Sequence, residues 1–232
     1  MRVIHPAPAE ASADDLYGAE RPRPRGRPWV GICMISSLDG TTVVDGRSGG
    51  LGNPTDAAVL GALRRAADVV LVGAGTVRAE GYGPPKQAAL RIGVVTSTGA
   101  VDADSELFTS GAGFLVMPDD GPSAPGGVDV VRAGEATVDL AAALTRLGDV
   151  VDDPAFVQCE GGARLNGALL ASGCVDELDL TVSPVLAGGD GARVTVGAPP
   201  ALTRFDLAHL ATEDGYLYGR WVRREISPAQ PS

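Results

Sequence analysis

Aromatic residues, histidine and cysteine are all scarce in this chain of 232 residues. Aromatic side chains make up 4% of it, too few for the stacking surfaces on which proteins bind single-stranded nucleic acid. The two histidines, His5 and His209, and the three cysteines, Cys33, Cys159 and Cys174, are widely spaced, and no Cys-x-x-Cys occurs. The sequence therefore predicts no metal site, and it favours buried, reduced thiols.

Long apolar runs and positive charge are lacking as well. No hydrophobic stretch reaches the length of a membrane span, and the N-terminus has no signal-peptide core. The formal net charge of −10 disfavours nucleic acid and anionic membranes as partners. We therefore expect a cytoplasmic protein that binds a small molecule. An acidic chain can still hold a dinucleotide, because a few backbone amides and arginines are enough to bind its phosphates.

What the chain does contain is a regular alternation of buried strands and helices. Apolar segments at 28–36, 68–73, 90–96 and 156–159 are typical of strands, and residues with helical spacing follow several of them. An Asp-Gly pair between two alternating segments, at 214–215, predicts a C-terminal antiparallel hairpin. The predicted fold class is α/β, with a central mixed, mostly parallel sheet that is flanked by helices.

We expect three parts along the chain. Residues 1–27 are rich in proline and alanine and end in a basic run, which is typical of a flexible or surface-bound arm. An arm that crosses to a partner subunit is the alternative. Residues 28–226 are expected to form the folded domain, and residues 227–232 a disordered tail.

One junction between a strand and a helix is rich in glycine. The strand at 156–159 ends in Glu160-Gly161-Gly162, and a helix is predicted from Ala163 to Ser172. Glycines let another group approach the backbone, and the first amides of a helix have no partner within it, so such a junction can hold a phosphate. The simpler interpretation is a tight turn that packs against the sheet.

A second junction of this kind lies earlier in the chain. The strand at 68–73 runs directly into Gly73-Ala-Gly-Thr76, and Arg78 follows where it can meet an anion. Two such turns fit a dinucleotide, although their spacing is not that of a Gly-x-Gly-x-x-Gly Rossmann unit. Thr96 ends a further strand, and its hydroxyl either binds an adenosine 2′-phosphate or closes a Ser/Thr turn.

The motifs around these turns resemble a known family. Residues 160–189, which begin Glu-Gly-Gly-Ala-Arg-Leu-Asn-Gly, are similar to the reductase family of riboflavin biosynthesis, the C-terminal half of the bifunctional pyrimidine deaminase–reductase. Residues 72–77 match the family pattern Val-Gly-x-Gly-Thr-Val. The resemblance covers about residues 28–224. It implies a single dihydrofolate reductase-like domain, NADPH as cofactor and a homodimer.

The resemblance also implies a set of cofactor-binding residues. They are Gly73, Gly75, Thr76, Val77, Arg78, Thr96, Glu160, Gly161, Gly162, Ala163, Arg164 and Leu165. Glu160 is in addition expected to be catalytic, close to the nicotinamide and the substrate. The alternative for Glu160 is a charge that only orients the turn after it.

The substrate side is expected to begin at Ser36-Ser-Leu-Asp-Gly40, which resembles the first-strand signature of the family. This resemblance implies that Asp39 is catalytic and faces the substrate ring, with Ser37 and Glu80 as further substrate-binding residues. The plainer roles are a turn residue for Asp39 and a surface charge for Glu80. Relatives have a basic residue after the signature, where this chain has Thr41, and residues 53–60 lack further basic or histidine residues.

The chemistry that these residues support is hydride transfer. We find no nucleophile–base triad, metal set or Schiff-base lysine in the sequence, which fits a reaction carried by a cofactor. The resemblance implies an NADPH-dependent 5-amino-6-(5-phosphoribosylamino)uracil reductase of riboflavin biosynthesis, without the motifs of the zinc deaminase half. Two alternatives remain open: a reductase of dihydrofolate or a dihydropteridine, and a nucleotide-binding protein without catalysis.

Overall fold

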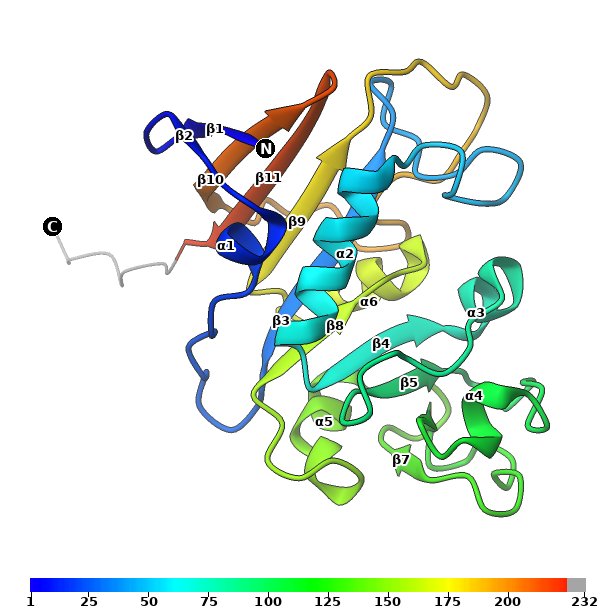
Figure 1. The fold of residues 1–232 in the computed structure, drawn as a ribbon. Helices are drawn as coiled ribbons and strands as arrows, with labels where there is room; N and C mark the ends of the chain where they lie inside the picture. Colours follow the sequence, from blue (N-terminus) through cyan, green and yellow to red (C-terminus); the bar gives the residue numbers. More distant parts are fainter. Residues whose placement is uncertain (225–232) are drawn as a thin grey trace, which may run out of the picture.

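A computed structural model of the protein describes residues 1–224, so the tail predicted at 227–232 lies outside the described residues. Within them, one sheet has the strand order β2-β1-β10-β11-β9-β3-β8-β4-β5-β6-β7 (Figure 1). The strands from β9 to β7 run parallel to one another, and β11, β10, β1 and β2 continue the sheet in antiparallel fashion. The mixed, mostly parallel sheet is therefore confirmed.

The bounds of the elements follow the predicted order closely. The strands are β1 (Arg2–His5), β2 (Ala9–Glu10), β3 (Trp29–Ser36), β4 (Val69–Gly73), β5 (Arg91–Val95), β6 (Gly113–Met117), β7 (Val130–Arg132), β8 (Phe156–Cys159), β9 (Glu177–Val182), β10 (Phe205–Glu213) and β11 (Tyr216–Arg223). The helices are α1 (Ala13–Tyr17), α2 (Pro54–Ala66), α3 (Ala74–Glu80), α4 (Glu106–Thr109), α5 (Leu140–Thr145) and α6 (Ala163–Ala171), with a 3₁₀ turn, η1 (Leu147–Asp149).

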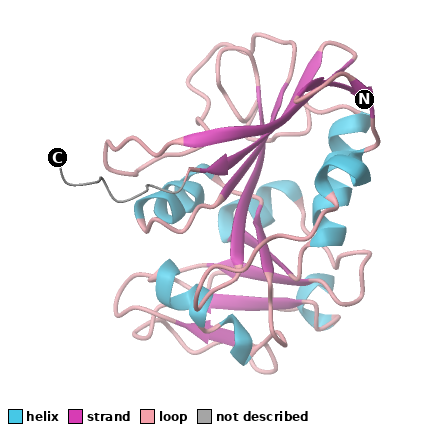
Figure 2. Cartoon of the chain, turned by 90° about the vertical axis from the view of Figure 1, so that its left-hand side faces the viewer, coloured by secondary structure: helices cyan, strands magenta, loops and turns pink. Residues whose placement is uncertain are grey.

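Helices cover both faces of the sheet (Figure 2). Strand β4 shows how the sequence directs this, because successive side chains of a strand point to opposite faces. Val70 and Val72 pack in one apolar cluster with side chains of α1, α2 and α4, and Val69 and Leu71 pack in a second cluster with side chains of α5 and α6. All four are buried. The sheet thus carries a core on each side.

Helix α2 begins where the sequence predicts it. The Asn53 side chain accepts a hydrogen bond from the Asp56 amide at 2.8 Å, and Pro54 occupies the first helical position. The helix crosses one face of the sheet beside β3 and β8 (Figure 1). Its start therefore lies near the carboxyl ends of those strands, and this places Asp56 near the same edge.

The predicted C-terminal hairpin is confirmed. Strands β10 and β11 pair in antiparallel register through the turn at Asp214 and Gly215, which have φ angles of 50° and 83°. Both residues adopt the left-handed conformation that tight hairpin turns require. In residues 1–224 the longest helix, α2, has 13 residues, and no helix has the length and apolar character of a bilayer crossing.

The N-terminal segment differs from the flexible arm predicted for residues 1–27. Strand β1 pairs with β10 and extends the sheet, and α1 packs against α2. Tyr17 is 1% exposed and meets the His209 ring edge-on at 4.7 Å, while buried Arg21 forms an ion pair with Glu177 at 2.7 Å. Tyr17 and Arg21 are single residues within a proline-rich stretch, and their partners lie far away in the sequence. The composition of the segment therefore could not predict these contacts.

Candidate active site

The two glycine-rich turns lie side by side at the carboxyl edge of the sheet. Strands β8 and β4 are parallel neighbours, and the Gly73 amide donates a hydrogen bond to the Gly161 carbonyl at 2.8 Å. Gly161 has a φ of 86°, which favours glycine, and a cis peptide bond joins it to Gly162. A Cβ at Gly162 would lie 2.9 Å from Thr76 Oγ1, whereas one at Gly75 would meet nothing within 4 Å. Gly162 is thus packed closely against the first turn, whereas the backbone at Gly75 is open to a ligand.

A cavity of about 320 Å³ opens beside these turns. Its walls come from the starts of α3 and α6, from α2, from the end of β3 and from the loop after β3. The lining residues are Cys33, Met34, Ile35, Thr42, Val43, Gly46, Ser48, Asp56, Leu60, Gly75, Thr76, Ala79, Glu80, Tyr82, Glu160, Gly162, Ala163 and Ala192. Crevices at the carboxyl ends of parallel strands are the usual ligand sites of α/β proteins, so this cavity is the candidate active site.

Among the side chains that line the cavity, Glu160 accepts the most hydrogen bonds. Its carboxylate accepts two hydrogen bonds from Arg64, at 2.7 and 2.6 Å, and one from the Tyr82 hydroxyl at 2.6 Å. The Gln158 amide donates a further one at 2.8 Å. The side chain of Glu160 is 4% exposed and that of Arg64 is 26% exposed. The charged donors of Arg64 and the neutral donors of Tyr82 and Gln158 together hold this buried carboxylate in one orientation.

Sequence reasoning missed both partners of Glu160. Arg64 lies in the last turn of α2 and Tyr82 follows the left-handed residue Gly81 that ends α3. Burial raises the pKa of the Tyr82 hydroxyl, and the neighbouring Glu160 charge raises it further, so Tyr82 remains a hydrogen-bond donor. The Glu160 hydrogen bonds raise the pKa of Arg64. No local signal reveals this triad, because its members are 96 and 78 residues from Glu160.

Two loops form the outer wall of the cavity, one after β3 and one after β9, and they lie side by side (Figure 1). Thr42 donates through its amide and its hydroxyl to the Ala192 carbonyl, both at 2.8 Å. Thr41, at the position where the resemblance implied a basic residue, is buried and donates to the Val43 carbonyl at 3.0 Å. Gly191 packs so closely on it that a Cβ there would lie 1.6 Å from Thr41 Oγ1. This position joins the loops rather than lining the cavity.

The three residues predicted for the substrate side hold these loops in place. Asp39 accepts hydrogen bonds from Ser37 Oγ at 2.5 Å and from the amides of Ala187 and Gly188 at 3.1 and 2.7 Å. These donors lower its pKa to about 2. Glu80 does line the cavity, and its carboxylate accepts from the amide and the hydroxyl of Ser48 at 2.8 and 3.1 Å. Of the three, only Glu80 reaches the cavity wall.

The remaining predicted cofactor residues divide into two groups. Gly73 and Ala163 belong to the turns, and Val77 and Leu165 support them by packing in the two apolar clusters. Thr96 closes a Ser/Thr turn, since Oγ1 accepts from the Thr98 and Gly99 amides at 3.3 and 3.1 Å. Arg78 donates to the Ala100 carbonyl at 2.9 Å, away from the turns, and Arg164 is exposed in the first turn of α6. The structure therefore brings the glycines and Thr76 together and leaves Arg78 and Thr96 outside the cavity wall.

Asp56 and Cys33 are two further residues of the cavity that the sequence did not reveal. Asp56 comes from the first turn of α2 and lines the cavity. Burial raises the pKa of Asp56, and the Thr181 hydrogen bond opposes this rise. Burial and the charges of Asp179, Glu160 and Asp56 raise the pKa of the Cys33 thiol. Among residues 1–224, no group of three or more potential ligand side chains is arranged to hold a metal ion.

The sheet order, the terminal hairpin and the cavity at the carboxyl edge are those of the dihydrofolate reductase-like fold class. A dihydrofolate reductase from Enterococcus faecalis superposes with a TM-score of 0.51 and 14% identity, over 88% of this chain and 100% of that one. Within this class, the model of the RibD C-terminal domain matches residues 28–216. The chain belongs to this family, the pyrimidine reductases of riboflavin biosynthesis.

One further protein supports the family, and a second supports the fold. The chain is 28% identical over 210 residues to the 2,5-diamino-6-ribosylamino-4(3H)-pyrimidinone 5′-phosphate reductase of Methanothermobacter thermautotrophicus. The alignment covers 83% of this chain and 94% of that protein. A pyrimidine reductase-like protein from Corynebacterium diphtheriae superposes with a TM-score of 0.79 and 22% identity, over 93% of this chain and 100% of that one. The fold and the family predicted from the sequence are both confirmed.

Proposed function

We propose that this protein is an NADPH-dependent reductase that converts the ribosylamino group of a phosphoribosylaminopyrimidine into a ribitylamino group. The observation that carries the proposal is the pairing of the two glycine turns beside a cavity that contains a clamped carboxylate, Glu160. Family membership supports the reaction type. The sequence-based expectation for the substrate is 5-amino-6-(5-phosphoribosylamino)uracil, and the relative from Methanothermobacter thermautotrophicus is named for a 2,5-diaminopyrimidinone.

The glycine turns fit the cofactor. Helix α6 begins at Gly162 without a side-chain cap, so its first amides are available to an anion at the positive end of the helix. Gly75 leaves open space where any side chain would stand, and Thr76 Oγ1 lies against Gly162. We propose that these backbone groups, with Ala163 and the exposed Arg164, hold the phosphates of NADPH. Gly73, Val77 and Leu165 position the turns, and Arg78 and Thr96 are proposed to act at the adenosine end.

The reaction needs one hydride and one proton. The hydride adds to C1′ of the sugar, the bond from C1′ to the ring oxygen breaks, and that oxygen takes up the proton as a hydroxyl. When bound, NADPH supplies the hydride. Because Glu160 is fully hydrogen-bonded, its proposed catalytic role is a fixed negative charge that stabilises positive charge developing at C1′ and the nicotinamide. Asp39, Ser37 and Glu80 keep their proposed place on the substrate side through the loops that they anchor.

A substitution at Gly162 tests the cofactor site. Gly162→Asp introduces a Cβ 2.9 Å from Thr76 Oγ1 and a negative charge where phosphates are proposed to bind. We expect NADPH affinity, measured by quenching of protein fluorescence, to fall by at least about 100-fold, with circular dichroism unchanged. Gly126→Asp adds the same charge in a loop where a Cβ meets nothing within 4 Å, and it should bind NADPH like the parent protein. Equal affinity of the two variants would contradict the assignment of the phosphates.

The same preparation separates the alternative functions. Oxidation of NADPH with a phosphoribosylaminopyrimidine supports the proposal. Oxidation with dihydrofolate or a dihydropteridine alone supports the related reductase, and tight binding without oxidation of any substrate supports a nucleotide-binding protein. Absence of NADPH binding would overturn all three.

We further infer a cytoplasmic location and a homodimeric state. Cys33, Cys159 and Cys174 are free thiols, and a reducing compartment keeps such thiols reduced. Exposed apolar side chains in the loops that follow β3 and β9 support a contact between subunits.

A further inference from the structure

The carboxylate of Glu160 has a donor at each of its acceptor positions. An ionised carboxylate offers about four lone-pair positions for hydrogen bonds. Oε1 accepts from Arg64 Nε at 2.7 Å and from Gln158 Nε2 at 2.8 Å. Oε2 accepts from Arg64 Nη2 and from the Tyr82 hydroxyl, both at 2.6 Å. A carboxylate filled in this way is fixed in orientation, and it can bind a further donor only by losing one of these four.

Tyr82 differs from the other two donors in where it lies. Arg64 comes from α2 and Gln158 from β8, behind the wall of the cavity. Of the described residues that line the cavity, Tyr82 is the one that donates to Glu160. Its phenol therefore contacts both the carboxylate and the space that a ligand would occupy. Burial and the Glu160 charge raise the pKa of the Tyr82 hydroxyl, so the proton stays on the donor.

A short helix connects Tyr82 to the first glycine turn. Helix α3 follows Gly73 directly and ends at the left-handed residue Gly81, whose φ is 70°. The amides of Gly81 and Tyr82 both donate to the Val77 carbonyl, at 3.0 and 3.2 Å. The backbone of Tyr82 is thereby tied to the middle of the helix that the first turn opens. Because Glu160 begins the second turn, the hydrogen bond from Tyr82 to Glu160 is a further link between the two turns.

We propose that Tyr82 is a positioning residue for the reduction, which fixes the Glu160 carboxylate relative to the helix whose first turn is proposed to hold the cofactor phosphates. The inference rests on the proposed reductase function and adds a residue to it. Glu160 is proposed to stabilise positive charge at C1′ and the nicotinamide, and this charge develops in the transition state. An error in the orientation of Glu160 should therefore lower kcat and leave the binding of NADPH nearly unchanged.

The first test is Tyr82→Phe, which removes the hydroxyl and keeps the ring over which the Arg64 guanidinium lies, 5.6 Å from its centroid. We expect kcat with a phosphoribosylaminopyrimidine to fall by about 10-fold or more, the effect of one hydrogen bond to a charged group. The KM for NADPH should change by less than about 2-fold. Tyr216→Phe removes a hydroxyl that donates to the Leu51 carbonyl at 3.0 Å, outside the cavity wall, and should keep the kcat of the parent protein.

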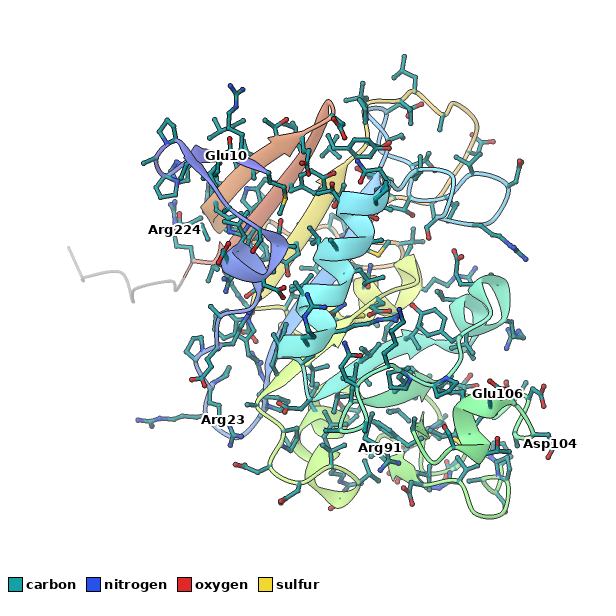
Figure 3. All side chains as sticks on the ribbon, viewed as in Figure 1. Glu10, Arg23, Arg91, Asp104, Glu106 and Arg224 are labelled. Carbon is teal, nitrogen blue, oxygen red and sulfur yellow. The ribbon has the colours of Figure 1, made fainter. Side chains whose placement is uncertain are left out.

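A double-mutant cycle shows whether Tyr82 acts through Glu160. In the Glu160→Gln background, which removes the charge, Tyr82→Phe should change kcat by less than about 2-fold, so that the two single effects are not additive. Glu10→Gln makes the same chemical change on the edge strand β2, on the far side of the molecule from α3 (Figure 3). In that background Tyr82→Phe should retain its full effect. Additive losses in the cycle of Tyr82 and Glu160 would overturn the inference.

Gly81 offers a second test that leaves the Tyr82 side chain unchanged. Alanine is strained at a positive φ, whereas asparagine adopts this conformation more readily. Gly81→Ala should therefore displace Tyr82 relative to α3 and lower kcat, and Gly81→Asn should retain most of the kcat of the parent protein. Gly111→Ala introduces the same strain at a φ of 78°, in the turn after α4, and at both glycines a Cβ meets nothing within 4 Å. Equal kcat values for Gly81→Ala and Gly111→Ala would contradict the role of Tyr82.

The outcomes separate this inference from the proposed function. If the parent protein reduces no candidate substrate, the proposed function fails, and the role of Tyr82 in it fails as well. If the parent protein is active and Tyr82→Phe has the same kcat, the function stands and Tyr82 has no positioning role. Should Tyr82→Phe fail to fold, as judged by circular dichroism, the three glycine variants decide.

Discussion

At the scale of single residues, the cavity depends on how buried charges are paired. Removing one partner of a buried ion pair leaves the other without compensation, which costs more than the pair contributes. Glu160 is the clearest case, because its carboxylate is almost fully buried while the Arg64 side chain retains some exposure. Arg65, in the same turn of α2 as Arg64, forms an exposed ion pair with Asp14 of α1, so the chain contains its own comparison.

We therefore expect Arg64→Ala to lower the free energy of unfolding by about 2–3 kcal/mol, below the value for a fully buried pair because Arg64 is partly exposed. Arg65→Ala should cost less than about 1 kcal/mol. Urea denaturation followed by circular dichroism measures both. Glu160→Gln in the Arg64→Ala background should recover part of the loss, since it removes the orphaned charge. Similar losses in the two arginine variants would show that the Glu160 pair is not buried in solution.

Local rules predicted one part of this site and could not predict the other. The glycine turns at 73–75 and 160–162 follow from glycine conformational freedom and from helix starts, which are properties of short segments. The N-cap of α2 at Asn53 was likewise predictable from the sequence, because Asn followed by Pro is typical of a helix start. Arg64, Tyr82 and Asp56 act through partners that only the folded sheet brings near, and an arginine or an aspartate on a helix is usually a surface residue. Asp39 and Thr96 are the opposite case. Their motifs predicted contacts with ligands, but their side chains accept hydrogen bonds within local turns.

At the scale of elements, the N-terminal segment is attached to the sheet through a buried polar cluster. Tyr17 and Arg21 from this segment contact His209 of β10 and Glu177 of β9, respectively. Burial, and then the positive charges of Arg220 and Arg21, lower the pKa of His209 to about 4, while Glu177 opposes the shift. His209 is therefore neutral in the folded protein at a pH where an unfolded histidine is already protonated.

This gives a pH dependence of stability with a definite sign. Because the folded pKa of His209 lies below the unfolded value of about 6.5, the unfolded state binds the proton first, and stability is lost as the pH falls from about 6.5 towards 4. We expect a loss of about 2 kcal/mol across this window, reduced from the full shift by solvent screening. His209→Gln should remove this part of the slope, and His5→Gln, at an exposed position, should not. Parallel pH profiles for all three proteins in urea denaturation would contradict the assignment.

At the scale of the whole molecule, the surface bears on the homodimer that we propose. The two edge strands of the sheet, β2 and β7, have two and three residues, which is too short for extensive pairing between subunits. Leu38 and Leu186, by contrast, are 60% and 77% exposed, and the Leu38 amide donates to the Val185 carbonyl at 2.8 Å. These side chains form an apolar patch on the two loops that wall the cavity.

The predicted homodimer is expected to use this patch. Burying such side chains between subunits removes apolar surface from water, and a charge placed among them would remain desolvated. Sedimentation equilibrium should show a dimer for the parent protein and a dissociation constant at least about 100-fold weaker for Leu186→Asp. Leu202→Asp changes an even more exposed leucine, 92% accessible and outside the patch, and should remain dimeric. A monomeric parent protein would refute the dimer, and a dimeric Leu186→Asp would show that the contact lies elsewhere.

Because the patch belongs to the cavity loops, dimerisation through it would also fix the outer wall of the candidate active site, and the KM for the substrate should rise in Leu186→Asp.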